Sequence, residues 1–440
     1  MNPIALVIAL GAVSLSAVAV AAQPAEQAAA AVDGRAVAGE VKKLLNQHYV
    51  LPEARAKFAA VLDKGIASGR YDGAQAEKLV QLINADFATV TADKHLGLAY
   101  DPKYSAELAA GPPNAGADDA PPTAAEVAAA ERRNHGIIQL KVLPGNIRYL
   151  ESDGFVWAGA PTERAYDDAI RFLAGGDAII IDMRKNGGGS PDAVRYLTSH
   201  FTKPNTPLMT FYMGAEGTDR STSLGSLRAP SLAGKPLYVL TGKGSASAAE
   251  EFIGHVAGYK LGELVGERTA GAGFRNEFYA LPGGMVISIS VGQAILASTG
   301  KGWEAEGFTP TIETPLDRAL DAASVRAWRA IAQSAPADRA KTLRALAAVS
   351  EAKINPVKTA LPASAYAGTF GQRSVAVAEG KLVFTGLSGH KFDMIAMGPN
   401  EFTLEQDPAL RIHFAVNGAS VTGFEMVRGD GSKVTAARTQ

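Results

Sequence analysis

The segment that decides the fold is residues 178–191, AIIIDMRKNGGGSP. Its first four residues form a continuous apolar run, the pattern of a strand buried on both faces of a parallel sheet. Three glycines follow, and Ser190-Pro191 is a helix start signal. Because glycine lets the backbone approach a ligand closely and turn its N–H groups outward, the loop after this strand is a candidate binding site.

A second unit of the same kind follows about sixty residues further along the chain. Residues 237–240, LYVL, form an apolar run, and residues 244–250, GSASAAE, open the next helix. Ser247 at a helix N-terminus lies at the positive end of the helix dipole, where nearby amides can bind an oxyanion. The Ser247–Glu250 spacing is also that of a capping box, so a structural N-cap is the alternative interpretation. Two such units predict an α/β fold with a parallel sheet covered on both faces.

Composition limits the remaining functions. The chain has 440 residues, of which 47% are hydrophobic and 20% charged, a globular balance with room for several domains. Its net charge of −1 and the lack of a Lys/Arg cluster argue against a nucleic-acid partner. Without cysteine, disulfides and thiolate nucleophiles are excluded. The seven histidines are too widely spaced for a local H-x-x-x-H motif, and the glycine loop lacks the endings of nucleotide-binding loops. We therefore expect no cofactor and no metal ion.

The N-terminus predicts export. Residues 1–22 carry no charged side chain, and their apolar run ends in small residues before Gln23-Pro24. This is the cleavage pattern of a secretory signal peptide, although the usual basic residue at the start is missing. A retained N-terminal anchor is the alternative, because the run is long enough to cross a bilayer. We expect a periplasmic or secreted protein with no stable membrane span after cleavage.

Changes of pattern divide the chain into segments. Helical periodicity with Gly and Asp breaks continues to about residue 95, and Gly- and Pro-rich sequence at 109–125 is typical of a linker. From about 363, short apolar runs separated by turn residues predict an antiparallel β module, a small barrel or sandwich. The predicted division is a signal peptide (1–22), an N-terminal helical domain (35–100), a linker (101–135), an α/β domain (136–325), a helical connector (326–362) and a C-terminal all-β domain (363–440).

The order of these motifs resembles the S41 serine peptidases, the family of C-terminal processing, tricorn-type and interphotoreceptor retinoid-binding-protein-like members. Besides the two strand–loop units, the resemblance includes TADKHL at 91–96, LPGNIRYL at 143–150, GERTAG at 266–271 and WEAEGFTP at 303–310. It covers roughly residues 35–325. It implies a crotonase/ClpP-like peptidase domain, in agreement with the alternation of strands and helices. The tail after 363 is similar to small β domains appended to exported bacterial hydrolases.

The resemblance also distinguishes two branches of the family. The C-terminal processing branch pairs its serine with a lysine 25 residues downstream, where this chain has Ala272, and inserts a PDZ domain for which the segment between His95 and Asn134 is too short. The tricorn and retinoid-binding-protein-like branch uses an N-terminal histidine and a late glutamate. The resemblance therefore implies Ser247 as nucleophile, His95 as general base and Glu304 as the group that orients it.

The two amides that the resemblance implies for the oxyanion hole are those of Gly188 and Ala248. Ser245 and Glu306 are the nearest rivals of Ser247 and Glu304, and Arg184 is either a solvated loop residue or a ligand of a substrate carboxylate.

The expected function is that of an exported serine peptidase acting on peptide or protein substrates. The alternatives are a non-catalytic binding protein on the same fold and an esterase-type hydrolase. His135 and His255 are expected to be structural. The oligomeric state is not predicted.

Overall fold

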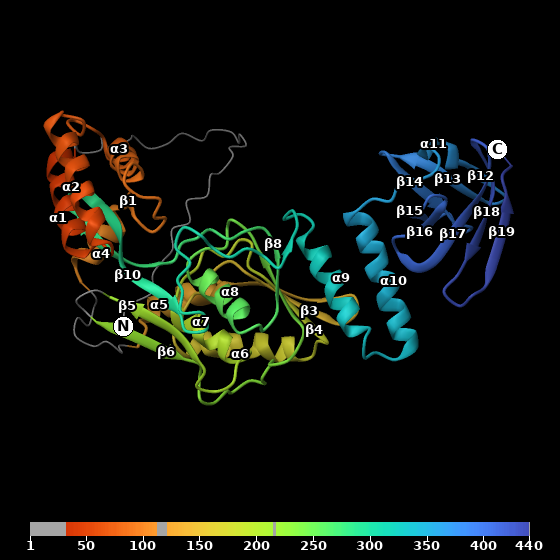
Figure 1. The fold of residues 1–440 in the computed structure, drawn as a ribbon, viewed down its shortest axis with the longest axis horizontal. Coiled ribbons are helices and arrows are strands. Elements are labelled where there is room, and N and C mark those ends of the chain that lie inside the picture. Colours follow the sequence, from red (N-terminus) through yellow and green to blue (C-terminus); the bar gives the residue numbers. More distant parts are fainter. Residues whose placement is uncertain (1–31, 112–120, 214–216, 440) are drawn as a thin grey trace.

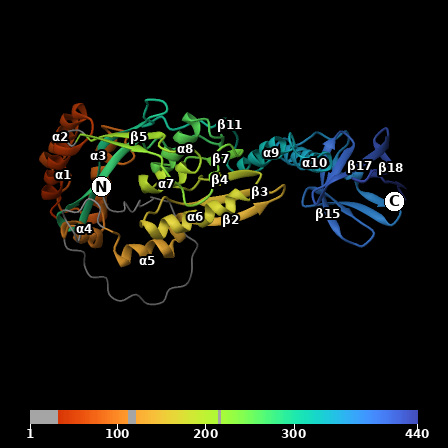
Figure 2. The same ribbon diagram turned by 90° about the horizontal axis from the view of Figure 1, so that it is seen from below.

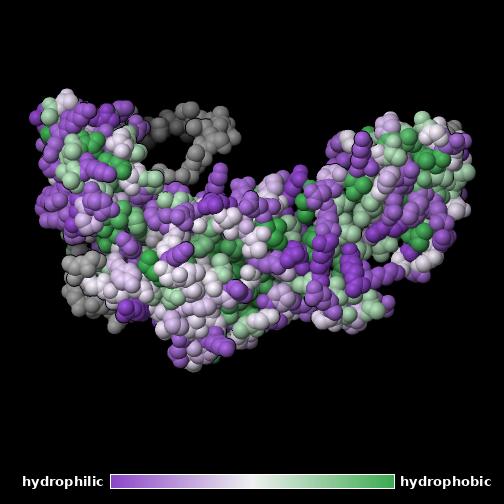
Figure 3. Space-filling view, viewed as in Figure 1, coloured by the Kyte–Doolittle hydropathy of each residue, from purple (hydrophilic) through white to green (hydrophobic). Residues whose placement is uncertain are grey.

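The computed structural model describes residues 32–111, 121–213 and 217–439 (Figure 1). The predicted signal peptide lies outside the described residues. Within them, no helix is long and apolar enough to cross a membrane. The helices at one end, the α/β body in the middle and the β module at the other end follow one another along the longest axis (Figures 1 and 3).

A six-stranded sheet forms the centre of the body. Its order is β11 (Ile312–Glu313), β8 (Glu263–Gly266), β7 (Leu237–Thr241), β4 (Ala178–Asp182), β3 (Ile147–Ser152) and β2 (Ile137–Leu143). All neighbours are parallel except β2 and β3. Every residue of β4 and β7 is buried, which explains their continuous apolar sequence.

Helices cover both faces of this sheet, as the sequence predicts. On one face, α6 (Ala160–Ala174), α7 (Pro191–Ser199) and α8 (Ala248–Gly258) share a core with Ile179, Ile181 and Val239. On the other face, α9 (Ala319–Ile331) and α10 (Ala337–Ile354) pack on Ile180 and Leu240. Replacing one of these fully buried isoleucine or leucine side chains by alanine lowers the free energy of unfolding by about 2–5 kcal/mol. The tightly packed sheet is therefore a rigid support for the loops at its edge.

The N-terminal helices do not have a core of their own. The helices α1 (Gly34–His48), α2 (Pro52–Ala67) and α3 (Ala76–Ala88) pack with Leu281, Met285, Ile287 and Ile289 of a distant hairpin. That hairpin consists of β9 (Phe274–Leu281), the 3₁₀ turn η3 (Pro282–Gly284) and β10 (Met285–Leu296). A five-stranded antiparallel sheet joins it to β1 (Gly97–Tyr100), β5 (Pro207–Tyr212) and β6 (Thr218–Thr222). The loop between α3 and β1 is thereby fixed against the α/β body.

The segment expected to be a linker contains secondary structure where it is described. It includes α4 (Pro102–Ala109), α5 (Ala124–Arg132) and the 3₁₀ turn η1 (Asn134–Gly136). Asp101 and Thr123 cap the two helices through their side chains, and Thr123 forms a capping box with Glu126. In Figure 2, α5 lies beside α6, below the body.

The C-terminal module is a barrel-like meander of eight antiparallel strands in chain order. The short helix α11 (Ala363–Tyr366) precedes the strands, which are β12 (Gly368–Phe370), β13 (Arg373–Ala378), β14 (Lys381–Thr385), β15 (Lys391–Gly398), β16 (Glu401–Leu404), β17 (Asp407–Asn417), β18 (Ser420–Val427) and β19 (Lys433–Ala437). The Thr439 N–H donates to Thr369 O at 2.8 Å, which brings the last segment back to the first strand. Aromatic side chains fill the interior, and α10 packs against β15 and β17.

Candidate active site

Ser247 lies between β7 and α8, at the carboxyl edge of the parallel sheet. Its φ of 55° and ψ of −123° are rare for a residue other than glycine. An ordinary N-cap residue is extended with negative φ, so Ser247 departs from cap geometry although it forms the capping box with Glu250. A conformation of this kind costs about 1–3 kcal/mol and projects the side chain from a sharp strand-to-helix turn. The strain is the first indication of function at this position.

The glycine loop lies directly against the serine turn. A Cβ atom on Gly188 would be 2.7 Å from Ser247 Cβ and 2.9 Å from Ala246 O, and φ of Gly188 is 107°. Only glycine fits this approach without displacing the serine turn. The Ala246 N–H donates to Asn186 O at 3.1 Å, so the two loops are also joined by a backbone hydrogen bond.

The two predicted oxyanion donors differ in this structure. The Ala248 N–H, the first of α8, donates to no protein acceptor among the described residues. The Gly188 N–H instead donates to Asn186 Oδ1 at 2.9 Å. Asn186 is fully buried, and its Nδ2 donates to Ser152 Oγ at 2.9 Å. In this conformation the Gly188 amide is therefore occupied.

Glu250 holds the serine turn to residues 269–272, the segment that Lys94, the neighbour of His95, also contacts. Its buried carboxylate accepts hydrogen bonds from the Ser247 N–H at 3.1 Å, the Gly271 N–H at 2.6 Å, the Ala272 N–H at 2.7 Å and the Thr269 hydroxyl at 2.5 Å. Burial raises the pKa of Glu250, while these four donors favour the charged form. One side chain thus fixes both loops around Ser247.

We expect Glu250→Gln to destabilise the fold by about 1–3 kcal/mol, because the amide group of glutamine turns a donor toward N–H groups that need an acceptor. Urea unfolding measures the loss. Glu306→Gln is the control, because Glu306 is exposed, and it should change the free energy of unfolding by less than about 0.5 kcal/mol. Equal stability of Glu250→Gln and the unmodified protein would contradict this role.

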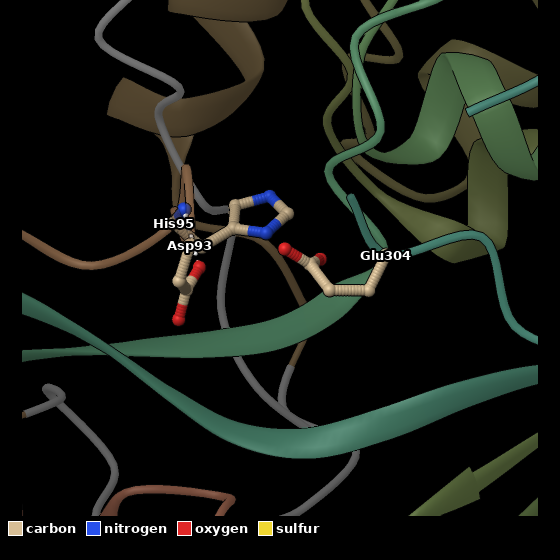
Figure 4. Close-up of side chains that lie close together, drawn as sticks. All are labelled: Asp93, His95 and Glu304. Atoms are coloured by element: carbon tan, nitrogen blue, oxygen red, sulfur yellow. Dashed lines mark hydrogen bonds between the residues drawn. The ribbon is translucent and has the colours of Figure 1, made fainter. Parts of the chain in front are cut away.

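His95 and Glu304 come together across the junction of the helices and the body, with Asp93 beside them (Figure 4). One donor atom from each of the three lies within 4.8 Å of the others. The Gly273 and Phe274 N–H groups donate to Glu304 Oε2 at 2.6 and 3.0 Å, and the His95 N–H donates to Asp93 Oδ1 at 2.8 Å. Asp93 Oδ2 and His95 Nδ1 are buried without a hydrogen-bond partner. These residues could also hold a metal ion.

Burial changes the acidity of these groups. It raises the pKa of Glu304 to about 7, helped by the charge of Asp93 and opposed by the two amide donors. Burial lowers the pKa of His95, and the charge of Asp93 opposes that shift. Both directions favour neutral forms, as expected for groups withdrawn from water. A neutral imidazole near pH 7 is the form that accepts a proton.

A short chain of contacts connects His95 to the serine turn. The Lys94 ammonium donates to Ala270 O, and the Ala270 N–H donates to Ser245 O at 2.9 Å. Gly271 and Ala272 then bind Glu250, and Gly273 binds Glu304. Among the described residues, however, His95 Nδ1 has no hydrogen-bond partner, and neither ring nitrogen of His95 bonds to Ser247. The structure thus places His95 near Glu304 and packs Ser247 against the glycine loop.

The remaining candidates from the sequence have structural roles. The Ser245 hydroxyl is fully buried, donates to Met183 O at 2.7 Å and accepts the Gly242 N–H at 3.1 Å. Arg184 is neither a solvated loop residue nor free to bind a substrate, because its guanidinium pairs with Asp182 at 2.5 Å. His135 is buried, with Nδ1 2.9 Å from Thr162 Oγ1, and His255 is fully buried in α8.

His255 has a buried partner on the same helix. Its Nε2 lies 3.6 Å from Glu251 Oε1, and Glu251 is also buried. Burial raises the pKa of Glu251, opposed by His255 and Arg275. The folded protein therefore holds a proton on Glu251 at pH values where the unfolded chain has released it. Over that window, which begins near the ordinary value of 4.5, the free energy of unfolding falls as pH rises.

We expect Glu251→Gln to remove this contribution to the pH dependence of stability. The stability of the variant relative to the unmodified protein should increase from pH 4.5 upward, because the uncharged amide has no proton to lose. Urea unfolding at a series of pH values measures the difference. Glu306→Gln should run parallel to the unmodified protein. A constant difference across the series would show that Glu251 ionises as it does in the unfolded chain.

The local sequence pattern does not predict the roles of three residues of this site. The S-x-x-E spacing assigns Glu250 only to a capping box and says nothing about Gly271 and Ala272, whose N–H groups it also accepts. Asn186 stands in the glycine loop, but nothing in its neighbours indicates that its side chain accepts the Gly188 N–H. Asp93 lies two residues before His95, a spacing that could have suggested the bond to the His95 N–H.

Sequence comparison identifies the family. The profile of peptidase family S41 matches residues 146–314, and the profile of the N-terminal domain of Peptidase_S41 in eukaryotic IRBP matches residues 32–140. The chain belongs to peptidase family S41. The two matched regions together cover well over half of this S41 protein. Ser247 and Glu304 lie in the first region, and His95 lies in the second.

Individual relatives of this S41 protein are distant. A carboxyl-terminal-processing protease of Synechocystis sp. is 28% identical over 146 residues, 32% of this chain and 33% of the relative, so the chain matches about a third of the length of that relative. A photosystem II D1 C-terminal processing protease has a TM-score of 0.43 at 17% identity, covering 65% of this chain and 94% of its own. Mature CPAF has a TM-score of 0.47 at 14% identity, covering 69% and 98%.

Proposed function

We propose that this S41 family member is an exported serine peptidase in which Ser247 attacks the peptide bond and His95 is the general base. The observation that carries the proposal is the backbone of Ser247, held at a φ of 55° against Gly188 at the edge of a rigid parallel sheet. The serine keeps this conformation although a helix N-cap does not need a positive φ. Such strain is typical of nucleophiles at strand-to-helix turns.

The proposed chemistry is acyl transfer. Ser247 Oγ attacks the carbonyl carbon as His95 takes its proton, which gives a tetrahedral oxyanion. Collapse of that intermediate expels the amine, which receives the proton from His95, and water then hydrolyses the acyl-enzyme by the same route in reverse. Glu304, whose carboxylate is fixed by the Gly273 and Phe274 amides, orients the imidazole and stabilises its protonated form.

The oxyanion would be bound by the Ala248 and Gly188 amides. Ala248 is ready for this role, whereas Gly188 has to exchange Asn186 Oδ1 for the oxyanion. A charged acceptor forms a stronger hydrogen bond than the neutral amide oxygen of Asn186, so substrate binding favours the exchange. One donor of this kind contributes about two to three orders of magnitude in turnover.

Reaction with a fluorophosphonate probe tests the proposal. The full chain should be labelled, Ser247→Ala should not, and the label should map to the peptide that contains residue 247. Comparing ester and peptide turnover on one preparation distinguishes a peptidase from an esterase-type hydrolase. No labelling of the folded protein between pH 6 and pH 9, roughly the range in which an imidazole base is active, would overturn the proposal in favour of a binding protein.

A further inference from the structure

The side chains of Asp93, His95 and Glu304, which meet between the N-terminal helices and the α/β body, could bind a metal ion as well as take part in catalysis. We propose that these three side chains form a zinc-binding site and that a bound Zn²⁺ ion blocks the general base. The binding site is inferred from geometry alone, while its inhibitory effect rests on the proposed function of His95. No residue of the serine turn takes part in binding the ion.

The donor set is suited to zinc. One imidazole nitrogen and two carboxylate oxygens lie within 4.8 Å of one another. Ligands of a tetrahedral zinc ion are separated by about 3.3 Å, so the three side chains need to move inward by roughly 1 Å or less each. Three protein ligands leave the fourth position open for water, as in zinc sites of mixed nitrogen and oxygen donors.

The fold leaves two of the donor atoms unpaired, although the Tyr49 hydroxyl lies near Asp93. Asp93 Oδ2 and His95 Nδ1 are buried and have no hydrogen-bond partner. A buried polar atom without a partner costs free energy, about 1–3 kcal/mol for a neutral group and more for a charged one. A cation between them would satisfy both atoms at once, since the ligand atoms of the three side chains lie within 4.8 Å of one another (Figure 4).

The outer contacts that support metal ligands are already present. The Gly273 and Phe274 amides hold Glu304 Oε2, and the His95 N–H holds Asp93 Oδ1. Each carboxylate therefore has one oxygen fixed by the backbone and one oxygen left for an ion, the arrangement that orients ligands in metal sites.

The local charge also favours a cation. Among the described residues neither carboxylate forms an ion pair with lysine or arginine, and the nearby Lys94 ammonium is directed to Ala270 O instead. With both carboxyl groups ionised, as metal ligands have to be, the site has a formal charge of −2 beside a neutral imidazole and no counter-ion. Divalent zinc, which prefers nitrogen and oxygen donors of this kind, compensates that charge fully.

Titration of the full chain with Zn²⁺, followed by calorimetry and repeated with Co²⁺ for its absorption spectrum, tests the site. We expect one ion per chain, and His95→Ala, Asp93→Asn and Glu304→Gln should each weaken binding by more than about 10-fold. Glu306→Gln, two residues from Glu304 and exposed, should bind as the unmodified protein does. Circular dichroism of each variant verifies that it is folded.

Ser247→Ala separates this proposal from the proposed function. It should bind Zn²⁺ normally although it cannot hydrolyse substrate. In the unmodified protein Zn²⁺ should inhibit turnover at the concentration at which it binds, and EDTA should restore activity. Absence of stoichiometric binding, or binding that survives His95→Ala, overturns the zinc site and leaves the peptidase proposal intact. Stoichiometric binding in a protein without any hydrolysis supports the site and overturns the peptidase.

Discussion

Ser247→Ala is expected to reduce turnover of a peptide substrate by about 10⁶-fold, to the limit of detection. Loss of the nucleophile in a serine peptidase has an effect of that size, because without the serine oxygen no acyl-enzyme can form. The residual rate comes from the amides of Ala248 and Gly188, which can still polarise a bound carbonyl. Steady-state kinetics with a fluorogenic peptide measures the loss, and the active-site probe should fail in parallel.

The stability of Ser247→Ala shows that the lost activity is chemical. The free energy of unfolding should change by no more than about 1–2 kcal/mol, the range of a lost helix cap, since alanine has to adopt the same positive φ. Ser245→Ala is the matched control with the opposite pattern. It should lose about 1–3 kcal/mol, because it leaves Met183 O and the Gly242 N–H unpaired, and should still be labelled by the probe. Full activity of Ser247→Ala would show that the nucleophile is another residue.

The parallel sheet could be predicted from sequence because its signal is local. The runs at 178–181 and 237–240 are buried on both faces, so they are apolar without interruption. The antiparallel sheet could not be found in this way. Strand β9 is half-buried along nearly its whole length, and strand β1 pairs with β10 almost two hundred residues later. Neither a periodic pattern nor a short turn connects β1 to its partner.

The same distinction explains the predicted helical domain. Its three helices and the break around Gly69 and Gly73 agree with the sequence pattern. Its core, however, includes Ile287 and Ile289, which no local pattern assigns to the N-terminal helices. This shared core holds the loop that contains His95 against the α/β body. The position of the candidate base therefore depends on long-range contacts that the local sequence does not predict.

The role of Ser247 illustrates what local sequence leaves open. A cap and a nucleophile have the same letters, S-x-x-E, at the start of a helix. The structure contains the capping box, and the positive φ of Ser247 and its contact with Gly188, in a loop sixty residues away, are the observations that support the proposed nucleophile. The occupied Gly188 amide could not be predicted either, since it results from the rotamer of the Asn186 side chain.

His95→Ala is expected to reduce turnover by at least about 10⁴-fold while leaving the fold intact. Its Nδ1 makes no hydrogen bond, so removing the ring leaves no protein donor or acceptor of that atom unpaired. Without a base the Ser247 hydroxyl keeps its proton at neutral pH and is a weak nucleophile. The same peptide assay measures the effect, and His390→Ala, an exposed histidine of the β module, should retain full activity.

Added imidazole distinguishes a general base from a residue that only shapes the loop. In His95→Ala, imidazole can enter the space left by the side chain, lie beside the Glu304 carboxylate and accept the Ser247 proton. Turnover should therefore rise with imidazole concentration in His95→Ala and not in Ser247→Ala. Because His95 does not bond to Ser247 in the free structure, this also tests whether the two approach during the reaction. If His95→Ala remained fully active, the base would have to be another group, and the proposed use of the Asp93–His95–Glu304 junction would be confined to binding the metal ion.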